Sequence, residues 1–228
     1  MGYLLLAGGA EFGGLMSEPD LRALELAGGP RAPIAILPTA AAPDNNHERA
    51  GRNGLRWFRS LGATRLDLVP VLDKRSAADP ALVGRIRRAR LIYILGGFPR
   101  YLCETLAGSP AWQAAQQAYA EGAVIAGSSA GAMVLCEHYY DPDAGSLLPG
   151  LGLIARACVL PHHNRSGRAW AKRVRSLTPE VTLIGIDERT GMIDDARGTW
   201  TAWGAGQVTL YHGGGVPEIH ARGESFGL

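Results

Sequence analysis

The stretch EGAVIAGSSAGAM, residues 121–133, places two adjacent serines directly after an apolar run. The apolar residues 122–127 predict a buried strand, and the residues that follow are compatible with a helix. The segment GSSAG (127–131) fits the G-x-S-x-G pattern of a sharp strand-to-helix turn whose middle serine is a nucleophile. This register selects Ser129, whereas Ser128 has only to be small. A plain turn in which either serine caps the helix explains the same five residues.

A second predicted strand, RLIYILGG (90–97), also ends in glycines. Glycine lets backbone amides approach a ligand closely. If GSSAG supplies a nucleophile, the amides of Gly97 and Ala130 are candidate donors to an oxyanion, the second because it lies at a helix N-terminus. The alternative is that Gly96 and Gly97 only turn the chain.

A nucleophilic serine needs a base, and the base needs an orienting acid. His162 and His163 follow a predicted strand in VLPHHNRSGR, where a loop can bring one of them to Ser129. Adjacent side chains diverge, so the pair is a poor metal site. The remaining histidines are expected on helices (His47, His138) or in or near the C-terminal tail (His212, His220).

The orienting acid has several candidates. Asp141 and Asp143 in YYDPDAGS lie between the serine and the histidines, although Asp-Pro-Asp-Ala-Gly is also ordinary turn chemistry. Asp187 and Glu188 in GIDERT follow another predicted strand. The residues alone leave the choice open.

The first half of the chain alternates apolar strands with helical segments, which is typical of βαβ units. Near-continuous apolar strands favour a parallel sheet covered on both faces. Short strands with little helix between them follow from residue 155 onward. We therefore expect an α/β fold: a mostly parallel, doubly wound sheet with helices on both faces and an antiparallel C-terminal extension. It forms one domain over residues 1–228, with a loosely ordered tail at 213–228.

The bulk composition excludes several classes of protein. The chain has 228 residues, 46% of them hydrophobic, and a net charge of only +2, which argues against nucleic-acid and membrane partners. No apolar run reaches the ~18 residues of a spanning helix. Three cysteines without a CxxC spacing indicate reduced thiols. We expect a cytoplasmic protein that needs no metal or cofactor; its oligomeric state is open, with a homodimer as one option.

Together these motifs resemble the peptidase E and cyanophycinase family of serine peptidases. The resemblance covers most of the chain and implies a class I glutamine-amidotransferase-like, flavodoxin-like α/β fold. It rests on LAGG (6–9), ILPTAA (36–41), YILGG (93–97), SAGA (129–132), PHH (161–163) with Arg168 downstream, and IGIDERT (184–190).

Residue by residue, the resemblance implies that Ser129 is the nucleophile and that His162, which follows Pro161, is the base. It also implies that Gly97 and Ala130 supply the oxyanion amides.

The same resemblance matches Glu188 to an acidic position near the substrate pocket. The family's triad acid lies between serine and histidine, where the spacing varies. Asp141 is therefore slightly preferred, Asp143 remains an alternative, and Glu188 is not excluded.

The substrate is less defined by the resemblance. Peptidase E members cleave dipeptides with an N-terminal aspartate, and such a substrate needs a cation beside its carboxylate. Arg165 and Arg168 could form that clamp, or they could be solvated residues of the following helix. Cyanophycinases typically carry an acidic or amide pair after GG, whereas this chain has Phe98-Pro99 and is short for that group.

The function expected is a serine exopeptidase acting on small peptides with an N-terminal aspartate. Three alternatives stay open: a cyanophycinase-like hydrolase of β-aspartyl peptides, an α/β-hydrolase-type esterase, and a non-catalytic member of the same fold. The short interval between Ser129 and His162 counts against the esterase.

Overall fold

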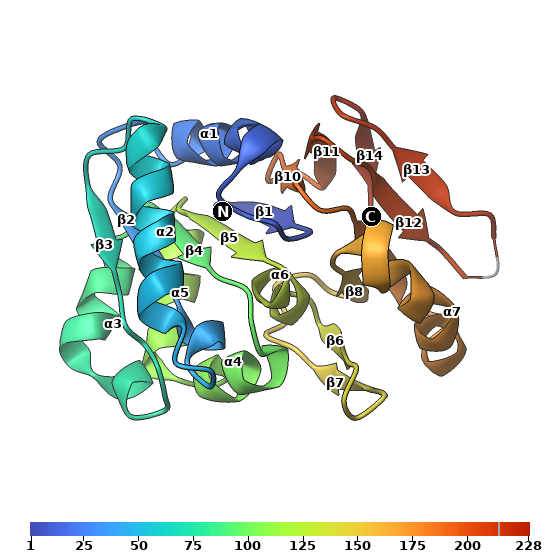
Figure 1. The fold of residues 1–228 in the computed structure, drawn as a ribbon, viewed down its shortest axis with the longest axis horizontal. Coiled ribbons are helices and arrows are strands. Elements are labelled where there is room, and N and C mark those ends of the chain that lie inside the picture. The colour runs from blue at the N-terminus through green and yellow to red at the C-terminus, as the bar shows by residue number, and fades with distance from the viewer. Residues whose placement is uncertain (214) are drawn as a thin grey trace.

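The computed structural model describes residues 1–213 and 215–228 and shows a large mixed sheet flanked by helices (Figure 1). The sheet has eight strands in the order β14-β11-β10-β1-β5-β4-β2-β3. Five of them are parallel: β1 (Tyr3–Ala7), β2 (Ile34–Leu37), β3 (Leu66–Leu68), β4 (Leu91–Ile94) and β5 (Val124–Ser128). These strands match the predicted apolar segments.

Helices cover both faces of this sheet, as the continuous apolar strands predict. On one face, side chains such as Leu5, Ile36 and Tyr93 pack against α1 and α2. On the other face, the adjacent strand residues, such as Leu6 and Ile92, point the opposite way and pack against the remaining helices of the first half. The helices are α1 (Ser17–Leu26), α2 (His47–Ser60), α3 (Pro80–Arg87), α4 (Pro99–Leu106), α5 (Pro110–Ala120) and α6 (Ala130–Leu135).

Proline and polar caps set several helix starts. Pro80, Pro99 and Pro110 each open a helix, where a missing N–H costs nothing. Asp79 and Ser109 accept hydrogen bonds from the first-turn amides of α3 and α5. Short 3₁₀ turns occur at Gly14–Met16, Thr39–Ala41 and Ser76–Ala78.

The predicted antiparallel extension is only partly correct. Strands β10 (Thr190–Asp194) and β11 (Thr199–Gly204) do extend the main sheet. A second sheet, in the order β13-β12-β9-β8, takes the other strands and lies beside α7 (Arg168–Leu177). It contains β8 (Ala157–Leu160), β9 (Thr182–Ile186), β12 (Val208–Tyr211) and β13 (Glu218–His220), and its β8–β9 pair is parallel.

Two further expectations are corrected. The segment after GSSAG forms only one short helix, α6, and His138 begins the hairpin strand β6 (His138–Asp141), which pairs with β7 (Ser146–Pro149). The tail is held in both sheets, because β13 pairs with β12 and β14 (Ser225–Gly227) pairs with β11. Phe226 in β14 is buried.

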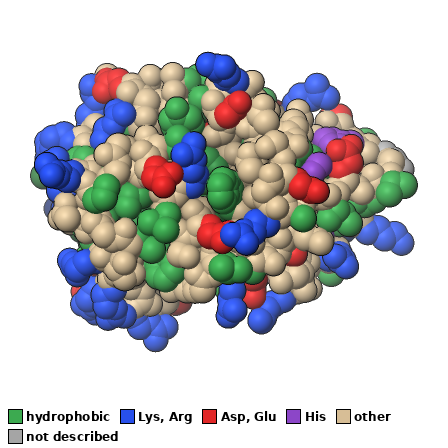
Figure 2. Space-filling model, turned by 90° about the horizontal axis from the view of Figure 1, so that it is seen from above, with side chains coloured by type: hydrophobic (Ala, Val, Ile, Leu, Met, Phe, Trp, Pro, Cys, Tyr) green, Lys and Arg blue, Asp and Glu red, His purple; other side chains and the backbone are tan. Residues whose placement is uncertain are grey.

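The surface carries a mixture of charges. On the face shown in Figure 2, Lys and Arg side chains are interspersed with Asp and Glu, consistent with the small net charge. Within the described residues, no helix is both long and apolar enough to cross a membrane.

Candidate active site

The GSSAG segment forms a tight turn between β5 and α6. Ser129 has φ 50° and ψ −114°, a strained conformation for a residue with a side chain. A Cβ on Gly127 would lie 2.5 Å from the carbonyl carbon of Gly131, and one on Gly131 would lie 2.3 Å from the carbonyl oxygen of Ile94. Both glycines of the motif are therefore needed so that the turn can fold back on itself and present Ser129.

His162 lies directly against this serine. Its Nε2 is 3.0 Å from Ser129 Oγ, although the residues are on different sheets. The histidine follows β8 with φ 48°, and its backbone N–H donates to the carbonyl of Gly8 over 2.7 Å. The ring rests on Gly9, where a Cβ would come within 2.2 Å of its Cε1 atom. Gly9 therefore makes room for the imidazole.

Glu188 completes the hydrogen-bonded series. Its Oε1 lies 2.9 Å from Nδ1 of His162, so a proton on Nδ1 leaves Nε2 free to accept from Ser129. The Glu188 backbone N–H donates to Oδ1 of Asn164 over 3.0 Å, and Arg165 Nε lies 2.8 Å from Oε2. Each carboxylate oxygen is thus engaged, which fixes the orientation of the carboxylate.

The junction of the two sheets creates this geometry. β5 of the main sheet delivers Ser129, and the end of β8 in the second sheet delivers His162. Glu188 lies in the short connection between β9 and β10, where the chain passes from the second sheet to the first.

The two amides expected to bind an oxyanion belong to segments that lie next to the serine. Ala130 is the first residue of α6, so its N–H has no acceptor within the helix. A Cβ on Gly96 would lie 3.1 Å from Ser129 Cβ, which places the Gly96–Gly97 segment beside the serine. Gly97 has φ 141°, and a Cβ there would collide with the Ala40 carbonyl oxygen at 2.2 Å. Position 97 therefore requires glycine.

The comparison with protein families agrees with this geometry. The model of "Peptidase family S51" matches residues 4–195, a span that contains Ser129, His162 and Glu188. The chain belongs to peptidase family S51. The resemblance to the peptidase E and cyanophycinase family is thereby confirmed.

Two S51 relatives of this chain are named cyanophycinase. The chain is 30% identical to the cyanophycinase of Synechococcus elongatus over 81% of its own length, but the match spans only 60% of that relative. It is also 30% identical to the cyanophycinase of Geminocystis herdmanii, over 92% of this chain and 80% of the relative.

Solved structures confirm the flavodoxin-like α/β fold. A peptidase from an acI-B1 Actinobacterium superposes with a TM-score of 0.90 at 30% identity, covering 100% of this chain and 97% of the other. A putative peptidase E protein from Listeria monocytogenes EGD-e gives a TM-score of 0.63 at 16% identity, covering 93% and 98%. The second likeness bears on the fold alone.

Asp141, the acid preferred from the sequence, is placed elsewhere in this S51 chain. It lies at the end of β6, where its Oδ1 accepts from the backbone amides of Asp143 and Ala144 and its Oδ2 lies 2.8 Å from Arg100 Nε. Asp143 is exposed in the turn of the hairpin. The Asp-Pro-Asp-Ala-Gly segment is thus turn chemistry, and Glu188 replaces Asp141 as the partner of His162.

The two arginines do not form the expected clamp. Arg165 is largely exposed, and its guanidinium pairs with Glu188. Arg168 is exposed at the start of α7. Both follow His162 along a π-helical turn, His163–Gly167, which carries the chain into α7.

His163 has a structural environment that differs sharply from that of His162. It is buried, and its Nε2 lies 2.8 Å from the Tyr211 hydroxyl. Burial lowers the pKa of His163, and Asp187, 3.4 Å away, opposes this shift. A Cβ on Gly185 would lie 2.4 Å from its ring. The second histidine of the motif therefore packs in the second sheet.

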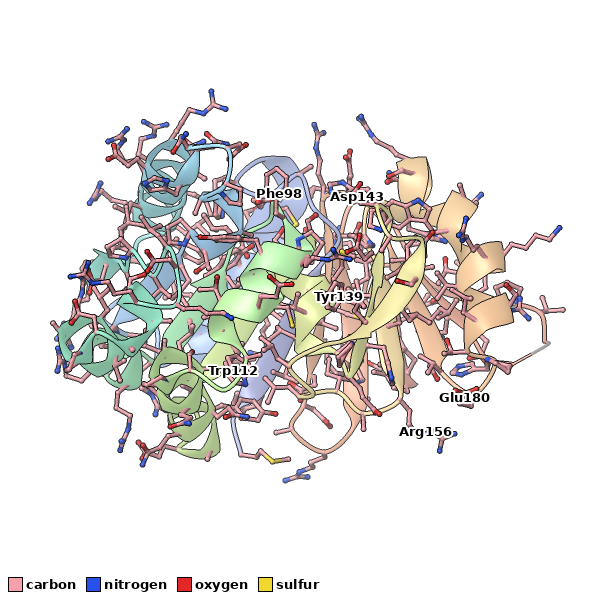
Figure 3. The ribbon with its side chains drawn as sticks, turned by 90° about the horizontal axis from the view of Figure 1, so that it is seen from below. Phe98, Trp112, Tyr139, Asp143, Arg156 and Glu180 are labelled. Carbon is pink, nitrogen blue, oxygen red and sulfur yellow. The ribbon has the colours of Figure 1, made fainter. Side chains whose placement is uncertain are left out.

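A hollow of about 300 Å³ lies at the edge of the molecule next to the Gly96–Gly97 segment. Figure 3 shows Phe98, which directly precedes α4, and Asp143 of the β6–β7 hairpin near the same edge. The hollow is lined by both of them and by Arg100, Glu104 and Asp141, among others. It adjoins Gly97 through Phe98, so it is a candidate site for part of a substrate.

Sequence reasoning missed two residues of this site, Asn164 and Glu11. Asn164 directly follows the two histidines, and a side-chain amide in that position was a usable signal. Glu11 accepts a hydrogen bond from Ser128 Oγ over 3.0 Å. It follows the LAGG strand end, which converges on the same sheet edge as GSSAG.

Proposed function

We propose that this S51 peptidase hydrolyses small aspartyl peptides by nucleophilic attack of Ser129. One observation carries the proposal: the unbroken hydrogen-bonded series from Ser129 Oγ through His162 to Glu188. A serine, a histidine and a carboxylate in this order activate the hydroxyl for acyl transfer.

The proposed reaction has two stages. Ser129 Oγ attacks the peptide carbonyl while His162 Nε2 takes its proton, and the amides of Gly97 and Ala130 stabilise the oxyanion. His162 then gives the proton to the departing amine, which leaves an acyl group on Ser129. Water, deprotonated by His162, releases the acid product and restores the serine. Glu188 holds the imidazole and stabilises its charged form.

The leading substrate is a dipeptide with an N-terminal aspartate. A cation is needed for the aspartate carboxylate, and Arg165 and Arg168 are the nearby candidates in sequence. The pairing of Arg165 with Glu188 weakens its case, because that guanidinium already has an anionic partner. Arg168 has no such competitor among the ion pairs of the described residues.

A second candidate is cleavage of β-aspartyl peptides. The observation that favours it is the 30% identity to proteins named cyanophycinase over 81–92% of this chain. The chain matches only 60% of the first of these relatives, so their whole activity is not carried over.

A substrate panel tests the proposal. Asp-Leu, β-Asp-Leu, Glu-Leu, Asn-Leu and a short acyl ester are incubated with the wild type and with Ser129→Ala. We expect wild-type turnover of at least one aspartyl peptide and loss of that turnover in Ser129→Ala. Hydrolysis of the ester alone would favour an esterase. No turnover, together with no labelling of Ser129 by a fluorophosphonate, would favour a non-catalytic protein.

A further inference from the structure

Glu11 holds a carboxylate beside the serine turn without belonging to the Ser129–His162–Glu188 series. Its Oε2 accepts from Ser128, the residue before Ser129. Its Oε1 and the Ser129 Cβ both lie within 3.5 Å of the point that a Cβ on Gly96 would occupy. The carboxylate is therefore within reach of a group attached next to a carbonyl under attack by Ser129.

The backbone holds Glu11 in place at a cost in strain. Ala10 and Phe12, on either side of it, have φ of 53° and 65°, which non-glycine residues rarely adopt. The Phe12 ring anchors the loop by packing against Phe58 and Tyr93 at centroid distances of 6.5 and 5.6 Å. A strained, anchored loop at this position is typical of a functional site.

One oxygen of Glu11 is available. Among the described residues, Oε2 has its partner in Ser128, whereas no hydrogen bond is made to Oε1. Glu11 is half-buried and also lines a hollow of about 510 Å³ with Phe12, Asn53, Arg56, Trp57 and Ser60. A ligand can thus reach the carboxylate from solvent.

We propose that Glu11 binds the free α-ammonium group of the peptide, so that this enzyme acts only from an N-terminus. The inference rests on the proposed function, because it assumes a peptide carbonyl at Ser129. The α-ammonium is one carbon away from that carbonyl, and a carboxylate is its natural charged hydrogen-bond acceptor. Glu188 is not available for this task, because both its oxygens are engaged.

The test compares a free-amine substrate with its deaminated analogue. Asp-Leu and succinyl-Leu share the same carbon skeleton but differ in the α-ammonium. We expect Glu11→Gln to lower kcat/KM for Asp-Leu by about 10–100-fold, the size of a lost charge-assisted hydrogen bond. The value for succinyl-Leu should change by less than about threefold, because that substrate never makes the contact.

Two further variants separate recognition from positioning. Ser128→Ala removes the hydrogen bond to Glu11 but keeps the carboxylate, so it should retain the preference for Asp-Leu. Glu180→Gln makes the same charge change at an exposed residue of the turn between α7 and β9, and should also retain it. Equal losses on both substrates in Glu11→Gln, or no loss on either, would overturn the proposal.

A binding measurement tests the ammonium site at Glu11 independently of the proposed hydrolytic activity. If the wild type hydrolyses neither substrate, the specificity for dipeptides with an N-terminal α-linked aspartate fails. Fluorophosphonate labelling of Ser129 is then followed in the presence of Asp-Leu or succinyl-Leu. Protection by Asp-Leu alone, lost in Glu11→Gln, supports the ammonium site. Protection by both peptides, or by neither, contradicts it.

Discussion

At the scale of single residues, His162 depends on a glycine that leaves it room. Gly9 has φ 111°, and the imidazole ring of His162 occupies the space that a side chain at position 9 would need. The same ring makes the contacts to Ser129 and Glu188. The position of His162 is therefore set by a residue that has no functional group of its own.

We predict that Gly9→Ala lowers kcat/KM by at least about 10²-fold, since the added Cβ must displace the ring and a shift of about 1 Å can cost that much. The matched control is Gly13→Ala in the same loop, where a Cβ meets nothing within 4 Å and the backbone is extended. Steady-state kinetics on both variants checks this. Equal activities would show that the loop does not set the position of His162.

Sequence patterns predicted the positions of Ser129 and His162 because each directly follows an apolar strand. They did not select the acid, since two carboxylates in a turn competed with one after a different strand. Asp141 lies between the serine and the histidine in sequence, yet Arg100 and the turn amides hold it in the hairpin. Only the three-dimensional contacts separate it from Glu188.

At the scale of elements, α1 and α2 meet around a buried acid. Asp20 of α1 accepts from the Trp57 indole of α2 over 2.7 Å and is fully buried. Burial raises the pKa of Asp20 to about 7; the Trp57 hydrogen bond opposes this shift, and the charge of Glu11 adds to it. Asp20 is thus protonated in the folded protein at pH values where it is ionised in the unfolded chain.

This difference predicts a stability that falls as pH rises. Between the unfolded pKa of 3.8 and the folded value of about 7, the folded state binds the extra proton, so raising the pH favours unfolding. Asp20→Asn cannot ionise and keeps an oxygen for Trp57. From pH 5 to pH 8 the wild type should lose about 2–3 kcal/mol more free energy of unfolding than the variant.

Urea unfolding at both pH values measures this. Asp194, whose pKa burial raises to about 6, contributes equally to both proteins and cancels in the comparison. Parallel pH profiles for wild type and Asp20→Asn would contradict the prediction.

The sequence pattern did not predict the β6–β7 hairpin, because the residues before it carry no signal that ends a helix. The residues after GSSAG continue without glycine or proline as far as Pro142, so composition alone suggested a longer helix. In the structure the helix ends at Leu135, and Cys136 is already extended, with φ −73° and ψ 167°. Backbone hydrogen bonds from Leu153 and Ile154 to Leu135 hold the chain there instead.

At the scale of the whole molecule, the site lies where two sheets meet. Strands β9 and β10 are close in sequence yet belong to different sheets, and their connection carries Glu188. The strand patterns predicted both strands but not their partners, because partner choice depends on contacts distant in sequence. The apolar, parallel first half could be predicted, because its strands other than the edge strand β3 are buried on both faces.

The C-terminal tail ties this arrangement together. Phe226 of β14 is buried and stacks on His220 of β13 at a centroid distance of 4.1 Å, so the ring joins strands of the two sheets. Arg222 between them pairs with Glu18 of α1.

We predict that Phe226→Ala lowers the free energy of unfolding by about 3 kcal/mol, the usual cost of removing a buried ring. Val216→Ala, at a residue that is 90% exposed in the same tail, should change it by less than about 0.5 kcal/mol. Urea unfolding checks both. Equal, small effects would mean that the tail is as loosely held as its glycine content suggests.

The central claim is that Glu188, and not Asp141, orients His162 for attack by Ser129. The most direct measurement is kcat/KM of Glu188→Gln and Asp141→Asn on whichever aspartyl peptide the wild type cleaves. We predict a loss of about 10²–10⁴-fold for Glu188→Gln, since the imidazole loses its anionic partner, and less than about fivefold for the folded Asp141→Asn protein. A large loss in Asp141→Asn with near-normal activity in Glu188→Gln would contradict the account.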